Sequence, residues 1–435
     1  MARQDQSAIV VVSHICPFPA IHGNRSRLVA LLRWLKSKDF RVTYVLQPLD
    51  LDDTSDVSAL ARLVDQLEIV RSPFQRPHAL VFLRRMAGRV ARAVLPKPVR
   101  ARLRRPQRHA PPSDSTVMAR WGTGDVYGDG HIDRWCWPGT CKVVRTLVEE
   151  MRPRAVIAEY ALLSKCFEEV PSSTLKVIDT VEVFFRNRER FNVEGLAAPF
   201  VCTQDSEREA LARADVLIGI QKNDAESLRQ LLPSKRVITV GHTYTLRGTP
   251  PREFTNGAVL YVGSSNPFNV HGLTQFLARA WSRIVSAVPQ ARLRIVGSCP
   301  RVDGSEQPGV FYVGRVTDEQ LTREYETAHV VINPQVAGTG LKIKCVEALS
   351  AGCPLVMNQA GADGLEEGVG RAFLVARDWD EFVRHVVEIM RDDSLRNSLE
   401  AEAAALAGRL FSAEATFSEL SAELSIDPGS SARAS

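Results

Sequence analysis

Short apolar runs alternate with stretches of helical length along this chain, and the alternation occurs in two series. The first series begins with the continuous apolar run Ile9–Ser13, which suits a strand buried on both faces. Its further strand-like runs are Val42–Leu46, Ala155–Ala158, Val177–Asp179, Val216–Ile220 and Val237–Val240. The runs of the second series are Val259–Gly263, Leu293–Val296, Val310–Val313, Val330–Ile332, Leu355–Met357 and Phe373–Val375. The pattern predicts an α/β fold of two facing Rossmann-like domains with parallel sheets, whose ligands bind at the carboxyl ends of the strands.

The boundary between the two series lies at Arg247–Gly257, a polar stretch that contains proline and glycine. We therefore expect an N-terminal domain over residues 1–246 and a C-terminal domain over residues 257–410. A helix and a disordered tail of small polar residues are expected over residues 411–435. Within the second domain, Leu273–Val288 carries a single apolar stripe at helical spacing and predicts one long helix.

A basic and then aromatic insertion interrupts the first series over residues 71–145. Residues 71–108 contain eleven Arg and one Lys with no acidic residue, so the rest of the chain has 43 basic against 50 acidic side chains. This distribution excludes a generally basic nucleic-acid binder, and we expect no nucleic-acid partner. Apolar and arginine residues interleave between 80 and 95, which favours a helix on an anionic membrane surface over a solvated insertion. The aromatic residues that follow suit either sugar or lipid stacking or core filling: Trp121, Tyr127, Trp135 and Trp137.

Other features predict a cytoplasmic protein, with peripheral attachment to the inner face of the membrane through residues 71–108. No stretch reaches the roughly 18 apolar residues of a membrane span, and the polar N-terminus does not fit a signal peptide. The eight cysteines include no CxxC pair, which favours a reducing compartment. Cys136 and Cys141, with His131 nearby, are interpreted as part of a turn rather than as metal ligands.

The segment Ala337–Pro354 carries the strongest local signal of chemistry. A predicted strand runs into the glycines Gly338 and Gly340, and a helix begins directly after them. Free N–H groups at a helix start favour an anion, and Lys342 and Lys344 add positive charge where the helix dipole alone would prefer acids. The segment therefore indicates an anionic ligand, although a tight turn with solvated lysines fits the same pattern.

Together with the residues before it, this segment resembles the group 1 glycosyltransferases, retaining enzymes of the GT-B fold. In the N-terminal half, residues 13–27 (SHICPFPAIHGNRSR) resemble the first loop of that family, and residues 177–188 (VIDTVEVFFRNR) resemble its DTHD element. In the C-terminal half, the matching residues follow the order of the family: Val262-Gly263, Asn266-Pro267, Asn269, Gly272-Leu273, Ala291–Gly297, Tyr325 and Gly338–Pro354.

The resemblance implies a nucleotide diphosphate sugar donor in the C-terminal domain and a glycan or lipid-linked acceptor against the N-terminal domain. The N–H of Gly340 with Lys342 and Lys344 would hold the donor diphosphate, and Glu347 matches the acid that hydrogen-bonds the ribose in the family. Lysines and helix N–H groups neutralise a diphosphate leaving group without a metal, so no cofactor is expected. Further substrate contacts are expected at Gly23, Asn24, Arg186, Arg188, Ser264, Gly338, Thr339 and Leu341.

Three positions depart from the pattern of the family. The arginine that often follows the first C-terminal strand is replaced here by Ser264 or Ser265. The histidine of the DTHD element is Val181 here, and the glutamate that often stands eight residues before the ribose acid is Thr339. His14, just past the first predicted strand, is a candidate to compensate at the reaction centre, with a structural role as the alternative. Glu159 and Tyr160, at the end of the strand Ala155–Ala158, are likewise either site residues or packing residues.

We therefore expect a hexosyltransferase-type enzyme of polysaccharide biosynthesis that transfers a sugar, with retention, to a hydroxyl acceptor such as a lipid-linked or cell-envelope glycan. Val181 and Thr339 favour an alternative, a catalytically silent GT-B protein that binds a sugar nucleotide or a partner as a scaffold. A sugar-nucleotide epimerase of the same fold fits the sequence less well.

Overall fold

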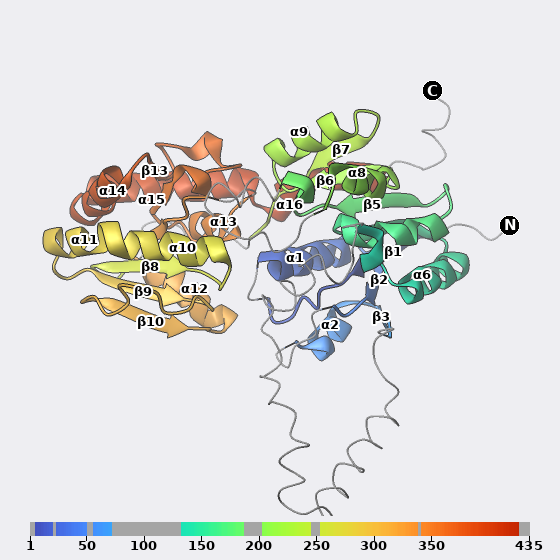
Figure 1. The fold of residues 1–435 in the computed structure, drawn as a ribbon, viewed down its shortest axis with the longest axis horizontal. Helices are drawn as coiled ribbons and strands as arrows, with labels where there is room; N and C mark the ends of the chain where they lie inside the picture. The colour runs from blue at the N-terminus through green and yellow to red at the C-terminus, as the bar shows by residue number, and fades with distance from the viewer. Residues whose placement is uncertain are drawn as a thin grey trace, which may run out of the picture.

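The chain folds into two α/β domains, each built on a parallel sheet, that lie side by side in Figure 1. The computed structural model describes residues 5–20, 23–49, 55–71, 132–186, 202–244, 253–337 and 341–425. The two-domain Rossmann-like architecture predicted from the alternating pattern is therefore confirmed.

The N-terminal domain contains seven parallel strands in the order β3-β2-β1-β4-β5-β6-β7. Its central strand is fully buried from Ile9 to Val12, because strands flank it on both edges and helices cover the sheet. The strands are β1 Asp5–Ser13, β2 Arg41–Leu46, β3 Gln66–Ile69, β4 Pro153–Glu159, β5 Leu175–Asp179, β6 Val216–Gly219 and β7 Arg236–Thr239.

The C-terminal domain contains six parallel strands in the order β10-β9-β8-β11-β12-β13. The strand order reverses direction between β8 and β11, so the crevice at the carboxyl ends of these two strands is the ligand position that such sheets offer. The strands are β8 Ala258–Val262, β9 Arg292–Val296, β10 Val310–Gly314, β11 Val330–Asn333, β12 Leu355–Asn358 and β13 Leu374–Ala376.

Helices pack on the sheets of both domains. In the N-terminal domain they are α1 Gly23–Ser37, α2 Val57–Leu63, α6 Pro138–Met151, α8 Gln204–Ala212 and α9 Lys222–Leu231, with the 3-10 turns η1 Ile132–Trp135, η2 Ala161–Glu169 and η3 Phe184–Arg186. In the C-terminal domain they are α10 Pro267–Phe276, α11 Ser282–Ala287, α12 Asp318–Thr327, α13 Ile343–Ser350, α14 Trp379–Arg391 and α15 Asp393–Leu410, with the short turns η5 Gln359–Gly361 and η6 Glu366–Gly368.

The predicted strands are present, and one further strand, β3, was not predicted. This edge strand, Gln66–Ile69, has exposed or half-buried residues throughout. An edge strand of this kind carries no continuous apolar run, so the pattern used for the central strands does not detect it.

The helix predicted over Leu273–Val288 is present, but it starts earlier and contains a π-helical turn. The helix begins at Pro267 because the side chain of Asn266 caps it, accepting the N–H of Phe268 at 2.9 Å. A π-helical turn, Leu277–Trp281, then separates α10 from α11. Such turns insert a residue into the helical repeat without breaking the apolar stripe, so the stripe alone did not show the interruption.

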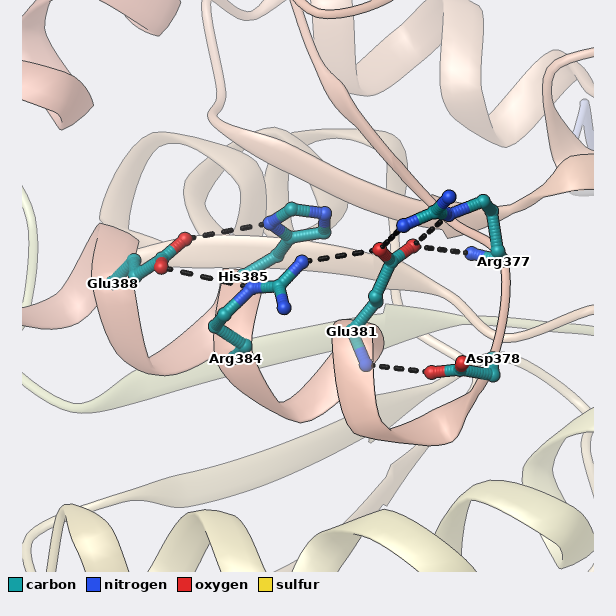
Figure 2. A network of polar contacts seen from close by, with 6 residues as sticks. All are labelled: Arg377, Asp378, Glu381, Arg384, His385 and Glu388. Atoms are coloured by element: carbon teal, nitrogen blue, oxygen red, sulfur yellow. Dashed lines mark hydrogen bonds and ion pairs between the residues drawn. The ribbon is translucent and has the colours of Figure 1, made fainter.

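Polar contacts hold the start of α14 against the end of β13 (Figure 2). Asp378 caps the helix by accepting the N–H of Glu381 at 2.8 Å, and the carboxylate of Glu381 accepts the backbone N–H of Arg377 at 3.0 Å and its Nε at 2.9 Å. Arg384, one turn on, donates to the same carboxylate at 3.2 Å and also approaches Glu388. Hydrogen bonds from Arg377 hold the pKa of Glu381 well below its usual value, so this carboxylate is charged in the folded protein at all ordinary pH values.

After α15 the chain returns to the N-terminal domain. The short helices α16 Ala413–Thr416 and α17 Ser418–Ser425 follow, and Phe417 stacks on Trp34 of α1 with 4.7 Å between ring centroids. Leu420 and Leu424 are buried against the same face of that domain. The two domains are thus connected at two places, after β7 and after α15.

Most of the basic and aromatic insertion lies outside the described residues, including the arginines from 76 to 108, Trp121 and Tyr127. Its described end is core: Trp135 and Trp137 are buried, and Gln47 holds the carbonyl of Trp135 and the N–H of Trp137. For these two residues core filling is the correct interpretation. In the part of the chain that the structure describes, none of the helices combines the length and apolar composition of a membrane span.

Candidate active site

The first turn of α13 presents the two predicted lysines. Lys342 is the residue before the helix, is buried, and provides no side-chain cap. The Nζ of Lys344 lies 2.6 Å from Oδ1 of Asn269 and 5.2 Å from the centre of the Tyr261 ring. Burial, and then the nearby charge of Lys342, lowers the pKa of Lys344 to about 8. Two cations held this close at a helix N-terminus favour an anionic ligand.

Glu347 lies one turn further along α13. It is buried, and its Oε2 accepts a hydrogen bond of 2.9 Å from the hydroxyl of Tyr325 on α12. Burial raises the pKa of Glu347 to about 7, while the bond from Tyr325 acts in the opposite direction. The second oxygen of the carboxyl group is the one left to receive a hydroxyl of a ligand.

Ser264 reaches the lysine site through Asn269. The hydroxyl of Ser264, just past β8, accepts a bond of 3.0 Å from Nδ2 of Asn269, whose Oδ1 accepts from Lys344. Asn269 therefore has a fixed amide orientation, and it holds the ammonium of Lys344 at the carboxyl end of β8.

The N-terminal domain contacts this segment at two points. A Cβ atom added to Gly23 would lie 2.6 Å from Cδ1 of Ile343, so the starts of α1 and α13 meet across the boundary between the domains (Figure 1). A Cβ atom added to Gly241, just past β7, would lie 3.8 Å from Cδ2 of Leu341. Two helix N-termini thus converge at this place, and helix N-termini favour anionic ligands.

Asn24, the residue after Gly23, continues this contact into the N-terminal domain. A hydrogen bond joins the side chains of Asn24 and Tyr160, and burial raises the pKa of Tyr160 well above its usual value. The ring of Tyr160 lies 5.3 Å from that of His14 and stacks on Phe184 at 5.6 Å. Burial lowers the pKa of His14 to about 4, so the imidazole is neutral at physiological pH. Its Nδ1 has no hydrogen-bond partner among the residues that the structure describes.

Two residues with a strained backbone lie at the same edge of the sheet. Tyr160, after β4, has a φ of 60°, and Val181, after β5, has a φ of 53°. A β-branched residue in the left-handed region costs on the order of 1–3 kcal/mol and is retained where the surrounding structure requires it. Strain of this kind at two neighbouring strand ends marks the carboxyl edge of the N-terminal sheet as a candidate binding surface.

A buried acidic group lies beside these residues. Glu159, the last residue of β4, is 2% exposed and accepts a hydrogen bond from the hydroxyl of Ser13. Burial raises its pKa to about 8, so Glu159 carries a proton at neutral pH. Within the described ranges no group of three His, Cys, Asp or Glu side chains is arranged to hold a metal ion.

The comparison with known families matches the part of the chain that carries the lysine site. Residues 256–392 match the family model described as glycosyl transferases group 1. This region contains β8 to β13, Ser264, both lysines and Glu347. The C-terminal domain therefore matches a group 1 glycosyltransferase domain over residues 256–392.

Curated relatives match parts of the chain. An uncharacterized 44.6 kDa protein in the cps region of Klebsiella pneumoniae is 27% identical over 192 residues, which are 41% of this chain and 48% of that protein. The O-antigen chain mannosyltransferase B of Escherichia coli is 36% identical over 107 residues, which are 24% of this chain and 27% of the transferase. The chain therefore aligns with about half of the first relative and about a quarter of the second.

Solved structures match the whole fold. Sucrose-phosphate synthase from Thermosynechococcus elongatus superposes with a TM-score of 0.64 at 14% identity, over 97% of this chain and 98% of the other. HepE from Anabaena, in a complex with UDP, superposes with a TM-score of 0.57 at 14% identity, over 96% and 99%. At this level of identity the likeness concerns the fold alone, and the expected GT-B architecture is confirmed.

Most predicted site residues of the glycosyltransferase domain and the first loop form one continuous line. It runs from His14 through Tyr160, Asn24 and Gly23 to the segment Leu341–Lys344, and then through Asn269 to Ser264. Arg186 is the last residue of η3, and the other two residues of this turn, Phe184 and Phe185, donate their N–H groups to Glu207. Gly338, Thr339, Gly340 and Arg188 lie outside the described residues.

Several residues that shape the site were not predicted as site residues. Asn269, Tyr261 and Tyr325 position Lys344 and Glu347, although the resemblance already contained Asn269 and Tyr325 in its motif. Arg27 and Asp179 form a buried ion pair at the first loop. In the sequence, this pair is an arginine one turn into a predicted helix and an aspartate at the end of a predicted strand. Such residues are too common for one sequence to identify the pair.

Proposed function

We propose that this chain is a glycosyltransferase that moves a hexose from a nucleotide diphosphate sugar to a hydroxyl acceptor with retention. The observation that carries the proposal is the cation site at the start of α13: Lys342 and Lys344 at a helix N-terminus that faces the start of α1. The donor diphosphate binds at this site, and Glu347 with Tyr325 receives the ribose hydroxyls. Gly338, Thr339 and Gly340, just before this helix, contribute backbone N–H groups and sugar contacts.

In the reaction, the bond between the sugar C1 and the β-phosphate oxygen breaks, and the electron pair leaves with the diphosphate. The acceptor oxygen forms the new bond to C1, and its proton passes to the oxygen of the leaving diphosphate that carried the sugar. Charge that develops on the diphosphate is stabilised by the two lysines and the helix N–H groups, so transfer proceeds without a divalent cation. A buried imidazole with a pKa of about 4 is a weak base. His14 therefore acts as a hydrogen-bonding group for the acceptor and not as the proton acceptor.

The acceptor is a lipid-linked or cell-envelope glycan that binds against His14, Asn24 and Tyr160. The similarity to a mannosyltransferase of O-antigen chains supports this class of acceptor. The basic segment 71–108, whose arginines from 76 onward lie outside the described residues, attaches the enzyme to an anionic membrane surface. Flotation with vesicles of anionic lipid tests this attachment, and binding that is insensitive to salt or to neutralising Arg84, Arg85, Arg89 and Arg92 would contradict it.

The experiment that tests the function is a panel of nucleotide diphosphate sugars, incubated with glycan and lipid-linked acceptors, with mass detection of products and NMR assignment of the new anomeric linkage. The expected result is transfer from one donor class, with the anomeric configuration retained and with full activity in the presence of EDTA. An inverted linkage would reject retention, and loss of activity with EDTA would reject metal-free transfer.

A second candidate is a catalytically silent protein that binds a sugar nucleotide as a scaffold. This alternative is favoured by Val181, which stands where the family has a histidine. Val181 keeps a strained backbone but cannot supply the imidazole. The same panel separates the two functions. Nucleotide binding without transfer or hydrolysis of any donor would support the scaffold and overturn the enzyme.

A further inference from the structure

A buried ion pair joins the first helix of the N-terminal domain to the end of its fifth strand. The Nε of Arg27 donates to Oδ2 of Asp179 at 2.9 Å, and its Nη2 donates to Oδ1 at 2.9 Å. Both side chains are 5% exposed. A buried pair of this kind is weak evidence for stability, because removing both charges from water costs about as much as their attraction returns. Its rigid two-bond geometry is suited to holding a third group in place.

The third group is the backbone that leads to the C-terminal domain. The remaining nitrogen of the guanidinium, Nη1, donates to the carbonyl of Gly241. Gly241 follows β7, and the chain runs from there to β8 in the glycosyltransferase domain. Arg27 therefore ties α1 and β5 to the first residues of the connection between the domains.

This tie is next to the donor segment. Gly241 packs beside Leu341, and Gly23, one helical turn before Arg27, packs against Ile343. Helix α1 thus reaches the segment that carries Lys342 and Lys344 by two routes. One route is the direct contact of Gly23, and the other runs through the guanidinium of Arg27 and the carbonyl of Gly241.

The groups packed around the pair do not compete with it for charge. Burial, and then the charge of Arg27, lowers the pKa of His242 to about 3, so this neighbour of Gly241 is neutral. Burial raises the pKa of Glu159 to about 8, so this carboxyl is protonated at neutral pH. Asp179 is the carboxylate to which Nε and Nη2 of Arg27 donate.

We propose that Arg27 is a positioning residue for sugar transfer: its guanidinium, oriented by Asp179, fixes the connection at Gly241 and thereby sets the donor segment opposite the start of α1. The proposal rests on the proposed function for its kinetic consequence. Arg27 touches neither substrate in this account, and it acts through Gly241 and Leu341.

The test is the Arg27→Lys variant of the full chain. Lysine keeps the charge but lacks the planar fork, so it does not hold Asp179 and Gly241 together. The donor binds to groups of the glycosyltransferase domain, so the Kd for a nucleoside diphosphate should stay within about twofold. The turnover number should fall about tenfold or more, because displacement of reacting groups by about 1 Å has effects of this size or larger.

The matched control is Arg213→Lys. Arg213 also makes two bonds to one carboxylate, that of Asp133, at 2.6 and 2.7 Å, and its other partners are Ser164 and Glu168 in the same domain. This variant should transfer sugar at the wild-type rate. Equal loss in both variants would show a general destabilisation and overturn the positioning role.

Hydrogen exchange supplies a readout that does not need activity. Peptides that cover 241–244 and 341–347 should exchange faster in Arg27→Lys than in the wild-type protein, and should be unchanged in Arg213→Lys. Wild-type exchange in Arg27→Lys would overturn the proposal, as would a parallel loss of donor affinity and turnover. If the wild-type protein transfers no sugar from any donor, the proposed function fails, while the exchange experiment still decides the role of Arg27.

Discussion

The ammonium of Lys344 lies 2.6 Å from the side-chain oxygen of Asn269 and within the first turn of α13. Burial lowers the pKa of this ammonium group to about 8. The protonated form binds a diphosphate more tightly than the neutral form, so the affinity is complete below pH 8 and decreases as the pH rises above it. The dependence differs from that of an ordinary lysine, whose charge persists to about pH 10.

The first prediction concerns this dependence. Affinity for a nucleoside diphosphate, measured by calorimetry from pH 6.5 to 9.5, should decline above about pH 8 by no more than about tenfold per pH unit. In Lys344→Arg the guanidinium stays charged over the whole range, so the decline above pH 8 should disappear even if the affinity itself is lower. The same decline in both proteins would assign it to a group other than Lys344.

The second prediction concerns the contact between the domains. Gly23→Ala places a methyl group 2.6 Å from Cδ1 of Ile343, so the isoleucine must move. We expect the rate of sugar transfer to fall by about threefold to thirtyfold, with donor affinity unchanged. The reason is that the added methyl group displaces the donor segment relative to the acceptor. Ile343→Val removes the clashing atom, and the double variant Gly23→Ala with Ile343→Val should recover most of the activity. A double variant no better than Gly23→Ala would reject this contact.

The third prediction concerns the strained backbone at Val181. Alanine and glycine both remove the packing of the valine side chain, but only glycine relieves a φ of 53°. Val181→Gly should therefore be more stable than Val181→Ala by about 1 kcal/mol. At most positions the alanine variant is the more stable of the two, so the expected order is reversed here. The chemical denaturation midpoints of the two variants measure this difference in stability. The usual order would show that the left-handed conformation is not retained.

The fourth prediction concerns Glu381, whose contacts are drawn in Figure 2. Its pKa in the folded protein is lowered, so the charged carboxylate stabilises the fold above the unfolded pKa of about 4.3, and this stability is lost as the pH falls through the folded pKa. Glu381→Gln should lower the thermal midpoint at pH 7, and by a smaller amount at pH 3, where part of the ionic contribution is already lost. Glu388→Gln, at a more exposed position of the same helix, should change it little at either pH. A loss for Glu381→Gln that does not depend on pH would contradict the ionic origin.

The fold could be predicted from the sequence because strands buried on both faces appear as continuous apolar runs. Ile9–Ser13 and Val330–Ile332 are such runs, and both are central in their sheets. Features without this signature were missed: the exposed edge strand β3, and the π-helical turn at Leu277–Trp281, which leaves the apolar stripe intact.

The candidate site was predictable where its residues are close together in the sequence. Lys342, Lys344 and Glu347 lie within one helix start, and the pattern of that segment indicates an anion site. Their partners are distant in the chain: Asn269 precedes Lys344 by 75 residues, and Arg27 precedes Asp179 by 152. A single sequence holds no information on such pairs, because they depend on how the strands are ordered in the sheet.

The most direct test of the account is the binding and use of a nucleotide diphosphate sugar by Lys344→Ala. Loss of a charge-assisted bond of about 1.5–3 kcal/mol should weaken nucleoside diphosphate binding by about tenfold to a hundredfold. Sugar transfer should become undetectable while the thermal midpoint stays within a few degrees of wild type. Lys142→Ala, at an exposed position of α6, is the control and should bind and transfer as wild type does. Unchanged affinity and turnover in Lys344→Ala would contradict the assignment of the donor site.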